Sequence, residues 1–311
     1  MPLRQALGIA GRLMPDLSVI IAIYNAVDII SDCLDSLMCQ QTDKAFEIIV
    51  VDSSEDGTAD LVRRRFPSVR LYHFQERKHP GDARNFGLGI ARSEVIAFLD
   101  ADCTVDPDWV ENVTAAHRSN HLVIGGVIDN GHSRNMVGWA YYFCEFNLWL
   151  PSNTFRQPRE IQEIAACCLS MKRVAYDRYG PFIEGTYSSD TAFHWKLLAD
   201  GHRVLQHPKI RIYHTAVHNG REFLSHTFSH RRQFARVRRR FRKESSLVPV
   251  VEVLLTPLLP AILFALITLR VFRARIHRVS FIRSSMLVLA GLFARTLGEL
   301  IGLLEESRHP T

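Results

Sequence analysis

The sequence predicts an α/β protein with a mostly parallel, doubly wound sheet, followed by a C-terminal membrane-associated helical region. Three observations predict this. Continuous apolar, β-branched runs alternate with helical patterns through residue 125, acidic residues directly follow two of these runs, and long apolar stretches occur only beyond residue 246. Strands buried on both faces of a parallel sheet read as unbroken apolar runs, and their alternation with helices implies βαβ units.

The first 125 residues supply the elements of this sheet in order. Strands are expected at Leu17–Ile23, Glu47–Val51, Val69–Phe74 and Glu94–Leu99, and helices at Asp28–Met38, Ala59–Phe66 and Gly81–Ala91. Ligands of such sheets bind beyond the carboxyl ends of the strands. Because Asp52 and Asp100 follow two of the predicted strands, we expect them to face one crevice.

Beyond Gly126 the pattern is less regular. Residues Trp139–Leu150 are rich in aromatic side chains and pack in the core or form a platform for an acceptor or a membrane interface. A further strand is expected within Ile164–Met171 and a helix at Asp190–Ala199.

Charge and cysteine content indicate which partners and which cellular compartment to expect. The 311 residues carry a net charge of +6, and Arg231–Lys243 holds eight basic residues and no acid. Next to a hydrophobic segment, such a block favours anionic lipid over nucleic acid, although a solvated basic helix has the same composition. The six cysteines show no metal-ligand spacing, so we interpret them as reduced, apolar residues of a cytoplasmic protein.

Two C-terminal stretches are apolar enough to enter a bilayer. Leu247–Leu269 has one charge, Glu252, and is interrupted by three prolines, and Met286–Leu304 contains the i,i+4 pair Arg295 and Glu299. Basic residues flank the first stretch on both sides, which conflicts with a single crossing. We therefore expect a proline-broken re-entrant or in-plane helical pair.

The acidic triplet Asp100-Ala101-Asp102 is the strongest chemical signal. Its two carboxylates follow an apolar strand, so they are delivered to the edge of the sheet. Oxygen ligands of this kind suit Mg²⁺ or Mn²⁺, which also bind phosphate oxygens of a substrate.

Four segments, taken together, resemble the inverting family-2 glycosyltransferases of the GT-A fold: Leu17–Asn25, Val50–Thr58, Ala83–Gly87 and Phe98–Asp102. The resemblance implies transfer of a sugar from a nucleoside-diphosphate donor with inversion at the anomeric carbon. It also implies that Asp102 ligates the metal between the phosphates and that the donor nucleotide-sugar contacts six residues, Tyr24, Asn25, Asp52, Arg84, Asn85 and Asp100.

The same resemblance points to a general base and a second metal ligand. Inversion needs one base to accept the proton of the acceptor, and Asp190 matches the family's position for it. An acid at a helix N-terminus is also favoured by the helix dipole alone. His214 follows the apolar stretch 210–213 where the family often has a metal-ligating or phosphate-contacting histidine, with His218 a nearby rival and a structural role the alternative.

The sequence departs from the family at three positions. Ser189 replaces the glutamate that precedes the base, which puts acceptor contacts in doubt. Ala22 replaces a proline, and Ser53 replaces a second acid after Asp52, so the ribose contact is reduced to one carboxylate.

These expectations define three regions and one function. Residues 1–16 form a tail or interfacial helix, 17–225 the catalytic domain (17–125 for the nucleotide-sugar, 126–225 for the acceptor side), and 226–311 the basic and hydrophobic membrane-associated helices. We expect a metal-dependent enzyme that uses a lipid-linked or cell-surface glycan acceptor and contacts lipid at the cytoplasmic side of the plasma membrane, without nucleic acid.

The sequence leaves three other functions to consider. A polyprenyl-phosphate sugar synthase has a phosphate acceptor that needs no strong base. A non-catalytic membrane scaffold with a transferase-like domain is disfavoured by the retained acids. A nucleotidyltransferase would need a Gly-rich basic loop after the first strand, and residues 24–28 supply none.

Overall fold

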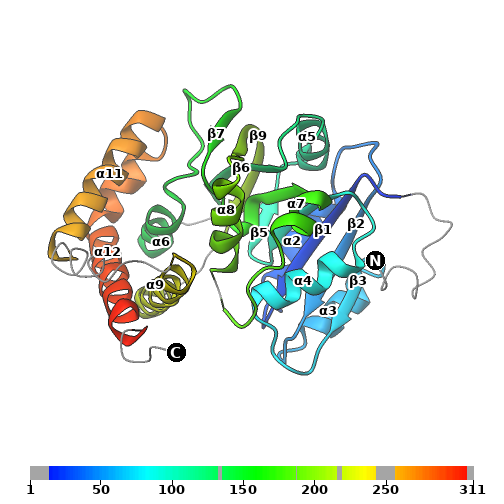
Figure 1. Ribbon diagram of the computed structural model, residues 1–311, viewed down its shortest axis with the longest axis horizontal. Coiled ribbons are helices and arrows are strands. Elements are labelled where there is room, and N and C mark those ends of the chain that lie inside the picture. Colours follow the sequence, from blue (N-terminus) through cyan, green and yellow to red (C-terminus); the bar gives the residue numbers. More distant parts are fainter. Residues whose placement is uncertain (1–13, 132–134, 187, 216–218, 243–255, 307–311) are drawn as a thin grey trace. The chain divides into compact units, whose positions relative to one another are not determined.

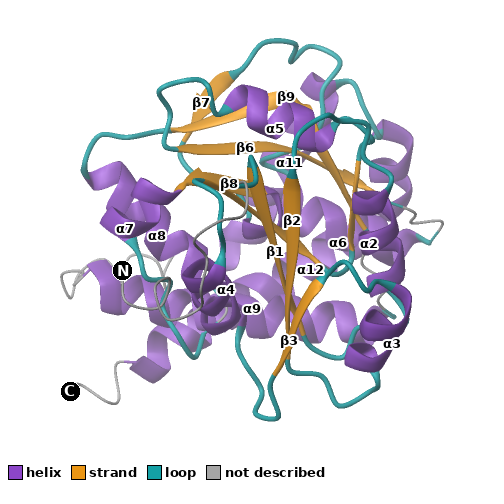
Figure 2. Cartoon of the chain, turned by 90° about the vertical axis from the view of Figure 1, so that its right-hand side faces the viewer, coloured by secondary structure: helices purple, strands orange, loops and turns teal. Residues whose placement is uncertain are grey.

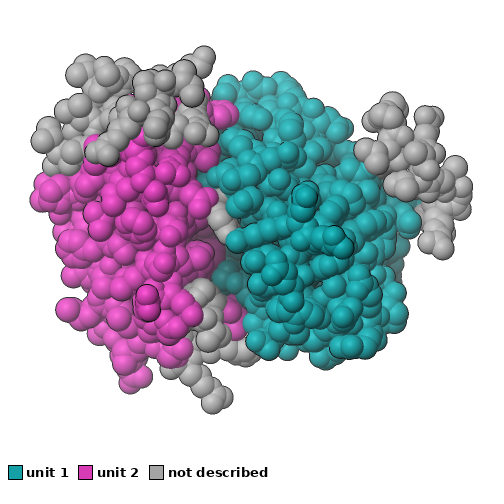
Figure 3. Space-filling view, turned by 90° about the horizontal axis from the view of Figure 1, so that it is seen from below, with its two compact units in different colours: residues 1–129, 157–214 teal, residues 130–156, 215–311 magenta. Residues whose placement is uncertain are grey.

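The computed structural model describes residues 14–131, 135–186, 188–215, 219–242 and 256–306 (Figure 1). The chain divides into two compact units, coloured separately in Figure 3: unit 1 comprises Met1–Asp129 and Gln157–His214, and unit 2 comprises Asn130–Arg156 and Thr215–Thr311. The expected N-terminal helix lies almost wholly outside the described residues, as do His218 and residues 247–255 of the first apolar stretch.

Unit 1 opens with the predicted parallel strands. In chain order its first elements are β1 (Leu17–Ile23), α2 (Ile30–Met38), β2 (Phe46–Asp52), α3 (Thr58–Arg65), β3 (Arg70–His73), α4 (Pro80–Ile90) and β4 (Val95–Asp100). These strands lie in the order β3-β2-β1-β4 with parallel pairing. Figure 2 shows α2 and α3 on one side of the strands and α4 on the other, as right-handed crossovers require when the strand order reverses at β1.

Later strands extend this sheet with antiparallel partners. They are β5 (Cys103–Val105), β6 (Val123–Asn130), β7 (Arg159–Ile161), β8 (Leu169–Lys172) and β9 (Val204–His214), joined by α5 (Trp109–Ala116), α7 (Arg173–Tyr179) and α8 (Ser189–Ala199). The order continues β4-β8-β6-β9-β5, and β8 runs antiparallel to both β4 and β6. The α/β class is confirmed, with a mixed sheet.

One expected strand begins later than predicted. Residues Ala166–Cys168 form the 3₁₀ turn η1, and the strand β8 starts only at Leu169. Two hydrogen bonds hold this turn: the Cys168 N–H donates to the Ala165 carbonyl at 2.9 Å, and the Ala166 N–H donates to the Asp190 carboxylate at 3.1 Å.

Unit 2 is helical. It contains α6 (Met136–Phe146), α9 (Gly220–Arg242), the 3₁₀ turn η2 (Thr256–Leu258), α11 (Leu259–Ala274) and α12 (Arg278–Glu306). The aromatic stretch forms α6, whose Tyr142 and Phe143 are buried, which favours its core-packing interpretation.

The basic block of α9 is partly paired within unit 2. Arg232 and Arg236 both contact the Glu305 carboxylate at 2.5 Å, and Arg238 contacts Glu299 at 2.9 Å. Part of the charge that the sequence assigns to lipid therefore holds α9 against α12.

Candidate active site

The carboxyl ends of three adjacent strands bring the two predicted acids to one edge of the sheet. In the strand register Asp52 lies opposite Ile23 on one side of β1, and Asp100 lies opposite Ala22 on its other side. Two strand spacings therefore separate these acids, which is about 10 Å. This edge lies where the strand order reverses, the usual ligand position in open α/β sheets.

Asp52 is fully buried and hydrogen-bonded. One carboxylate oxygen accepts the Ser54 hydroxyl at 2.5 Å and the Ser54 N–H at 3.2 Å, and the other lies 2.5 Å from Nδ1 of His73. His73 is the residue opposite Asp52 on β3. Asp52 thus fixes the loop after β2 and orients His73, whose side chain keeps 29% of its surface exposed.

The loop after β1 is tied to the same network. Asn25 has φ of 51°, a left-handed conformation that asparagine tolerates better than most residues. Its N–H donates to the Ser54 hydroxyl at 2.7 Å, and its side-chain oxygen accepts the Glu55 N–H at 3.0 Å. The neighbouring Tyr24 is 36% exposed, with the Arg77 guanidinium 4.1 Å from its ring centre. Tyr24 is therefore a partly exposed ring beside the Asp52 network, with the Arg77 guanidinium over it.

Arg84 and Asp100 form an ion pair. Arg84, on the inner face of α4, is 7% exposed, and its guanidinium donates to Asp100 Oδ1 at 2.9 Å. Burial raises the pKa of the Asp100 carboxyl, the Arg84 charge opposes this, and Asp102 adds to it. The Asp100 side chain nevertheless keeps 35% of its surface exposed, so the arginine positions an accessible carboxylate.

Asn85 is engaged elsewhere in unit 1. Its amide group donates to the Phe182 carbonyl at 2.9 Å and to Glu184 at 3.2 Å, and its oxygen accepts the Phe182 N–H at 3.0 Å and the Tyr176 hydroxyl at 3.3 Å. These four bonds use the full capacity of the amide. The geometry gives Asn85 a structural role, and its expected contact with the donor stays a prediction.

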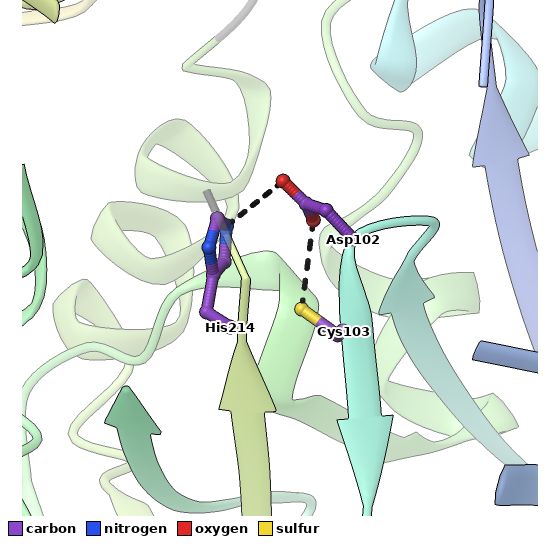
Figure 4. Close-up of side chains that lie close together, drawn as sticks. All are labelled: Asp102, Cys103 and His214. Atoms are coloured by element: carbon purple, nitrogen blue, oxygen red, sulfur yellow. Dashed lines mark hydrogen bonds and ion pairs between the residues drawn. The ribbon is translucent and has the colours of Figure 1, made fainter. Parts of the chain in front are cut away.

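Asp102, Cys103 and His214 form a second cluster, the Asp102 cluster, close to Asp100. His214, at the end of β9, pairs across the sheet with Cys103 on β5, so this pairing brings residues far apart in the sequence together. Figure 4 shows the Asp102 carboxylate between them: Oδ2 lies 3.4 Å from His214 Nε2, and Oδ1 lies 3.7 Å from Cys103 Sγ. The predicted metal residues Asp102 and His214 are thus adjacent.

These donors fit a divalent cation. Potential ligand atoms of Asp102, Cys103 and His214 all lie within 4.8 Å of one another. A carboxylate with an imidazole suits Mn²⁺, and the carboxylate alone suits Mg²⁺. A diphosphate would complete the coordination of either ion, so the residues present suit Mg²⁺ or Mn²⁺.

Asp190 lies in the first turn of α8. Its carboxylate accepts the Ala166 N–H at 3.1 Å and its neighbour Thr191's N–H at 3.0 Å. The adjoining turn η1 also carries the buried Cys167, whose thiol and that of Cys103 influence each other's pKa. The half-buried Asp190 is therefore connected through η1 to the Asp102 cluster.

Three residues of this site, namely Ser54, His73 and Cys103, were not predicted from the sequence. Ser54 contacts Asp52 because the loop after β2 turns back on the end of that strand, and His73 contacts it because it lies opposite Asp52 on β3. Cys103 gains its significance from the cross-strand pairing with His214. The position of Cys103 directly after Asp102 was the one available signal in the sequence.

Comparison with known proteins agrees with this architecture. A succinoglycan biosynthesis protein, ExoO of Rhizobium meliloti strain 1021, is 40% identical over 96 residues, 30% of this chain and 28% of that protein. The glycosyltransferase AglE of Haloferax volcanii is 30% identical over 122 residues, 37% of this chain and 40% of that protein. These matches span less than half the length of either relative.

Solved structures share the fold at low identity. S. aureus TarS in complex with UDP-GlcNAc superposes with a TM-score of 0.53 and 16% identity, covering 90% of both chains. GalNAc-T7 with UDP, GalNAc and Mn²⁺ also gives 0.53, at 17% identity, covering 67% of this chain and 44% of that one. Both are glycosyltransferase folds of the GT-A type.

A family model described as "Glycosyl transferase family 2" matches residues 18–180, which is more than half of the chain. The matched region contains Asp52, Asp100 and Asp102 at the carboxyl ends of the strands, together with Arg84 of α4, which contacts Asp100. This chain belongs to glycosyl transferase family 2.

Proposed function

We propose that this glycosyltransferase moves a sugar, with inversion, from a nucleoside-diphosphate donor to a lipid-linked or cell-surface glycan at the cytoplasmic side of the plasma membrane. The observation that carries the proposal is the row of Asp52, the Arg84–Asp100 pair and the Asp102–His214 pair along one edge of the sheet. Relatives named for succinoglycan biosynthesis and for poly(ribitol-phosphate) β-glucosylation support a cell-envelope acceptor.

The two ends of this row have different roles in binding the donor. On the Asp52 side, Tyr24 offers an exposed aromatic face on which a nucleotide base stacks, and Asn25 and Ser54 keep the loop beneath it in place. On the other side, Arg84 holds Asp100 in position for ribose or sugar hydroxyls. An arginine also adds positive charge close to the diphosphate.

Asp102 and His214 would hold Mn²⁺ or Mg²⁺. Such an ion, when bound, neutralises the charge that develops on the nucleoside-diphosphate leaving group. The two side chains are 3.4 Å apart and only partly exposed, at 28% for Asp102 and 7% for His214. Their restricted surroundings limit competition from bulk water.

Asp190 is the proposed general base. Backbone N–H groups of Ala166 and Thr191 each hold one of its carboxylate oxygens, so the side chain is oriented before the acceptor arrives. The carboxylate takes the proton of the acceptor hydroxyl as that oxygen attacks the anomeric carbon. A positioned base of this kind contributes about 10²- to 10⁴-fold to the rate.

An Asp190→Asn variant tests the assignment. We expect transfer to fall by about 10²- to 10⁴-fold with donor affinity unchanged. The matched control is Asp200→Asn at the other end of α8, whose carboxylate contacts Arg178 and Tyr179 and should leave the rate intact. Full activity of Asp190→Asn would contradict a hydroxyl acceptor and favour a phosphate acceptor, as in polyprenyl-phosphate sugar synthases.

The helices of unit 2 support contact with lipid. Thr256–Ala274 and Arg278–Glu305 are long and apolar enough to cross a membrane, which by length and composition alone is weak support. Over residues 286–304 the polarity of α12 is also inverted relative to a soluble helix. Exposed residues of α12 include Met286, Phe293 and Leu297, at 77%, 56% and 51%, whereas its charged Arg295 and Glu299 bond inward to Cys144 and Arg238.

An apolar outer face with inward charges is the arrangement expected of helices in a bilayer. We therefore propose that α11 and α12 enter the membrane through these faces. Flotation with lipid vesicles tests this. Phe293→Asp should reduce flotation at high salt, and Val174→Asp, which replaces a residue of similar 53% exposure on α7, should not. Equal flotation of both variants would contradict the lipid-facing role of α12.

A further inference from the structure

The Asp102 cluster contains a thiol as well as the expected metal ligands. Cys103 and His214 are directly opposed in the antiparallel pairing of β5 with β9, so their side chains leave the sheet on the same face. The Asp102 carboxylate reaches both, with one oxygen toward each (Figure 4). The three donors are a carboxylate, a thiol and an imidazole.

The spacing of these donors resembles that around a tetrahedral zinc ion. Bonds of about 2.3 Å to sulfur and about 2.0–2.2 Å to nitrogen and oxygen place neighbouring ligand atoms about 3.3–3.6 Å apart in a tetrahedron. His214 Nε2 lies 3.4 Å from Asp102 Oδ2, Cys103 Sγ lies 3.7 Å from Asp102 Oδ1, and one ligand atom from each of the three residues lies within 4.8 Å of the other two. Small side-chain rotations would close the set around Zn²⁺ without a change in the strands.

Donor chemistry separates zinc from the activating ions. Mg²⁺ binds oxygen, and Mn²⁺ suits the carboxylate with the imidazole, but neither favours a thiolate, whereas Zn²⁺ binds all three donor types. Cys103 and His214 are 0% and 8% exposed, so two of the three ligands are held by their strands. The preorganised pair favours a small ion that accepts sulfur and nitrogen.

We propose that Asp102, Cys103 and His214 form a zinc-selective inhibitory site. Zn²⁺ binds through three protein ligands and releases the Cys103 thiol proton to solvent as the zinc–sulfur bond forms. A four-coordinate ion then has one position left, whereas bridging a diphosphate requires two. Zinc therefore excludes Mn²⁺ or Mg²⁺ and blocks donor binding. The inhibitory part rests on the proposed function, and the zinc site itself does not.

Co²⁺ serves as the spectroscopic probe of the site. We expect titration of the full chain to give intense tetrahedral d–d bands and a sulfur-to-cobalt charge-transfer band, both removed by stoichiometric Zn²⁺. In Cys103→Ser the charge-transfer band should vanish and zinc affinity should fall about tenfold or more. The control is Cys168→Ser, because that buried thiol is directed at the Val127 carbonyl, 3.9 Å away, and should leave both readouts unchanged.

Several outcomes separate this inference from the proposed function. A charge-transfer band without any binding of a nucleotide-sugar supports the zinc site and contradicts the proposed function. Mn²⁺-dependent donor binding without a sulfur–cobalt band supports the proposed function and contradicts the zinc site. Unchanged zinc affinity in Cys103→Ser overturns the site. If that variant does not fold, zinc-edge X-ray absorption of the unaltered protein decides, because one sulfur neighbour at about 2.3 Å is required.

Discussion

Two glycines of α12 allow this helix to approach α9 closely. A Cβ atom added at Gly298 would lie 2.2 Å from the Phe228 carbonyl oxygen, and one at Gly302 would lie 2.3 Å from the Arg232 carbonyl oxygen. Real Cβ atoms essentially never approach within 3.0 Å, and a main-chain carbonyl cannot rotate away as a side chain can. Gly298→Ala therefore forces α9 and α12 apart by about 1 Å through a packed interface.

Two opposing effects determine the change in the free energy of unfolding in Gly298→Ala. Overpacking of a tight interface costs about 1–3 kcal/mol, and the obstructing main chain of α9 favours the upper end. Replacing a helical glycine by alanine returns about 1 kcal/mol of helix propensity. The free energy of unfolding should therefore fall by about 2 kcal/mol in Gly298→Ala.

Two matched substitutions calibrate this estimate. Gly89 in α4 has nothing within 4 Å of an added Cβ, so Gly89→Ala should stabilise the protein by up to about 1 kcal/mol. A Cβ atom at Gly291 would meet the side chains of Phe223 and Cys144, at 2.3 and 2.8 Å, rather than main chain, and because side chains adjust more readily, Gly291→Ala should cost less than Gly298→Ala. Thermal unfolding of the chain in detergent, followed by circular dichroism, measures all three. A Gly298→Ala protein as stable as Gly89→Ala would refute the packing of α9 against α12.

Two further predictions concern unit 1. Burial lowers the pKa of His117 to about 3, so the unfolded chain takes up the proton more readily than the folded protein. The contribution of His117 to the free energy of unfolding is therefore fully present above about pH 6.5. It is lost at up to about 1.4 kcal/mol per pH unit as the pH falls toward 3. Urea titrations of His117→Gln should lack this part of the slope, and an identical slope would contradict it. Asn85→Ala removes four hydrogen bonds and should cost about 2–4 kcal/mol. A loss below 1 kcal/mol, on the order of one surface contact, would show that these bonds are replaced by water.

The parallel half of the fold followed directly from the sequence. Strand β1 has the predicted bounds, Leu17–Ile23, because both of its faces are covered and its residues are almost all apolar. The predicted Glu47–Val51 lies inside β2, and the predicted Glu94–Leu99 is displaced from β4 by one residue. Local pattern was sufficient there, since each strand is buried by its own neighbouring helices.

The antiparallel half depended on pairing over long sequence distances. Strand β6, at Val123–Asn130, contains two glycines and gave no clear apolar period, yet it is buried between β8 and β9. The turn η1 depends on the Asp190 carboxylate, 24 residues further along the chain. Such contacts have no signature in the local sequence.

In the candidate site, too, residues with a local sequence pattern were predictable and residues placed by long-range contacts were not. Asp100 and Asp102 were predictable because they directly follow a strand, and the resemblance to the family supplied His214, which the structure places beside Asp102. The partners of Asp52 were not predictable, because Ser54 and His73 reach it through loop geometry and strand register. The assignment of Asp190 as the base stays a prediction.

Calorimetric titration with UDP-, GDP- and dTDP-sugars, with and without Mn²⁺, tests the central claim most directly. If Asp102 and His214 hold the metal that bridges the donor, one of these donors binds only with Mn²⁺ present, and Asp102→Asn abolishes that binding while the fold, checked by circular dichroism, is retained. Absence of binding by every donor with Mn²⁺ present, or equal binding by the Asp102→Asn variant, would contradict the account.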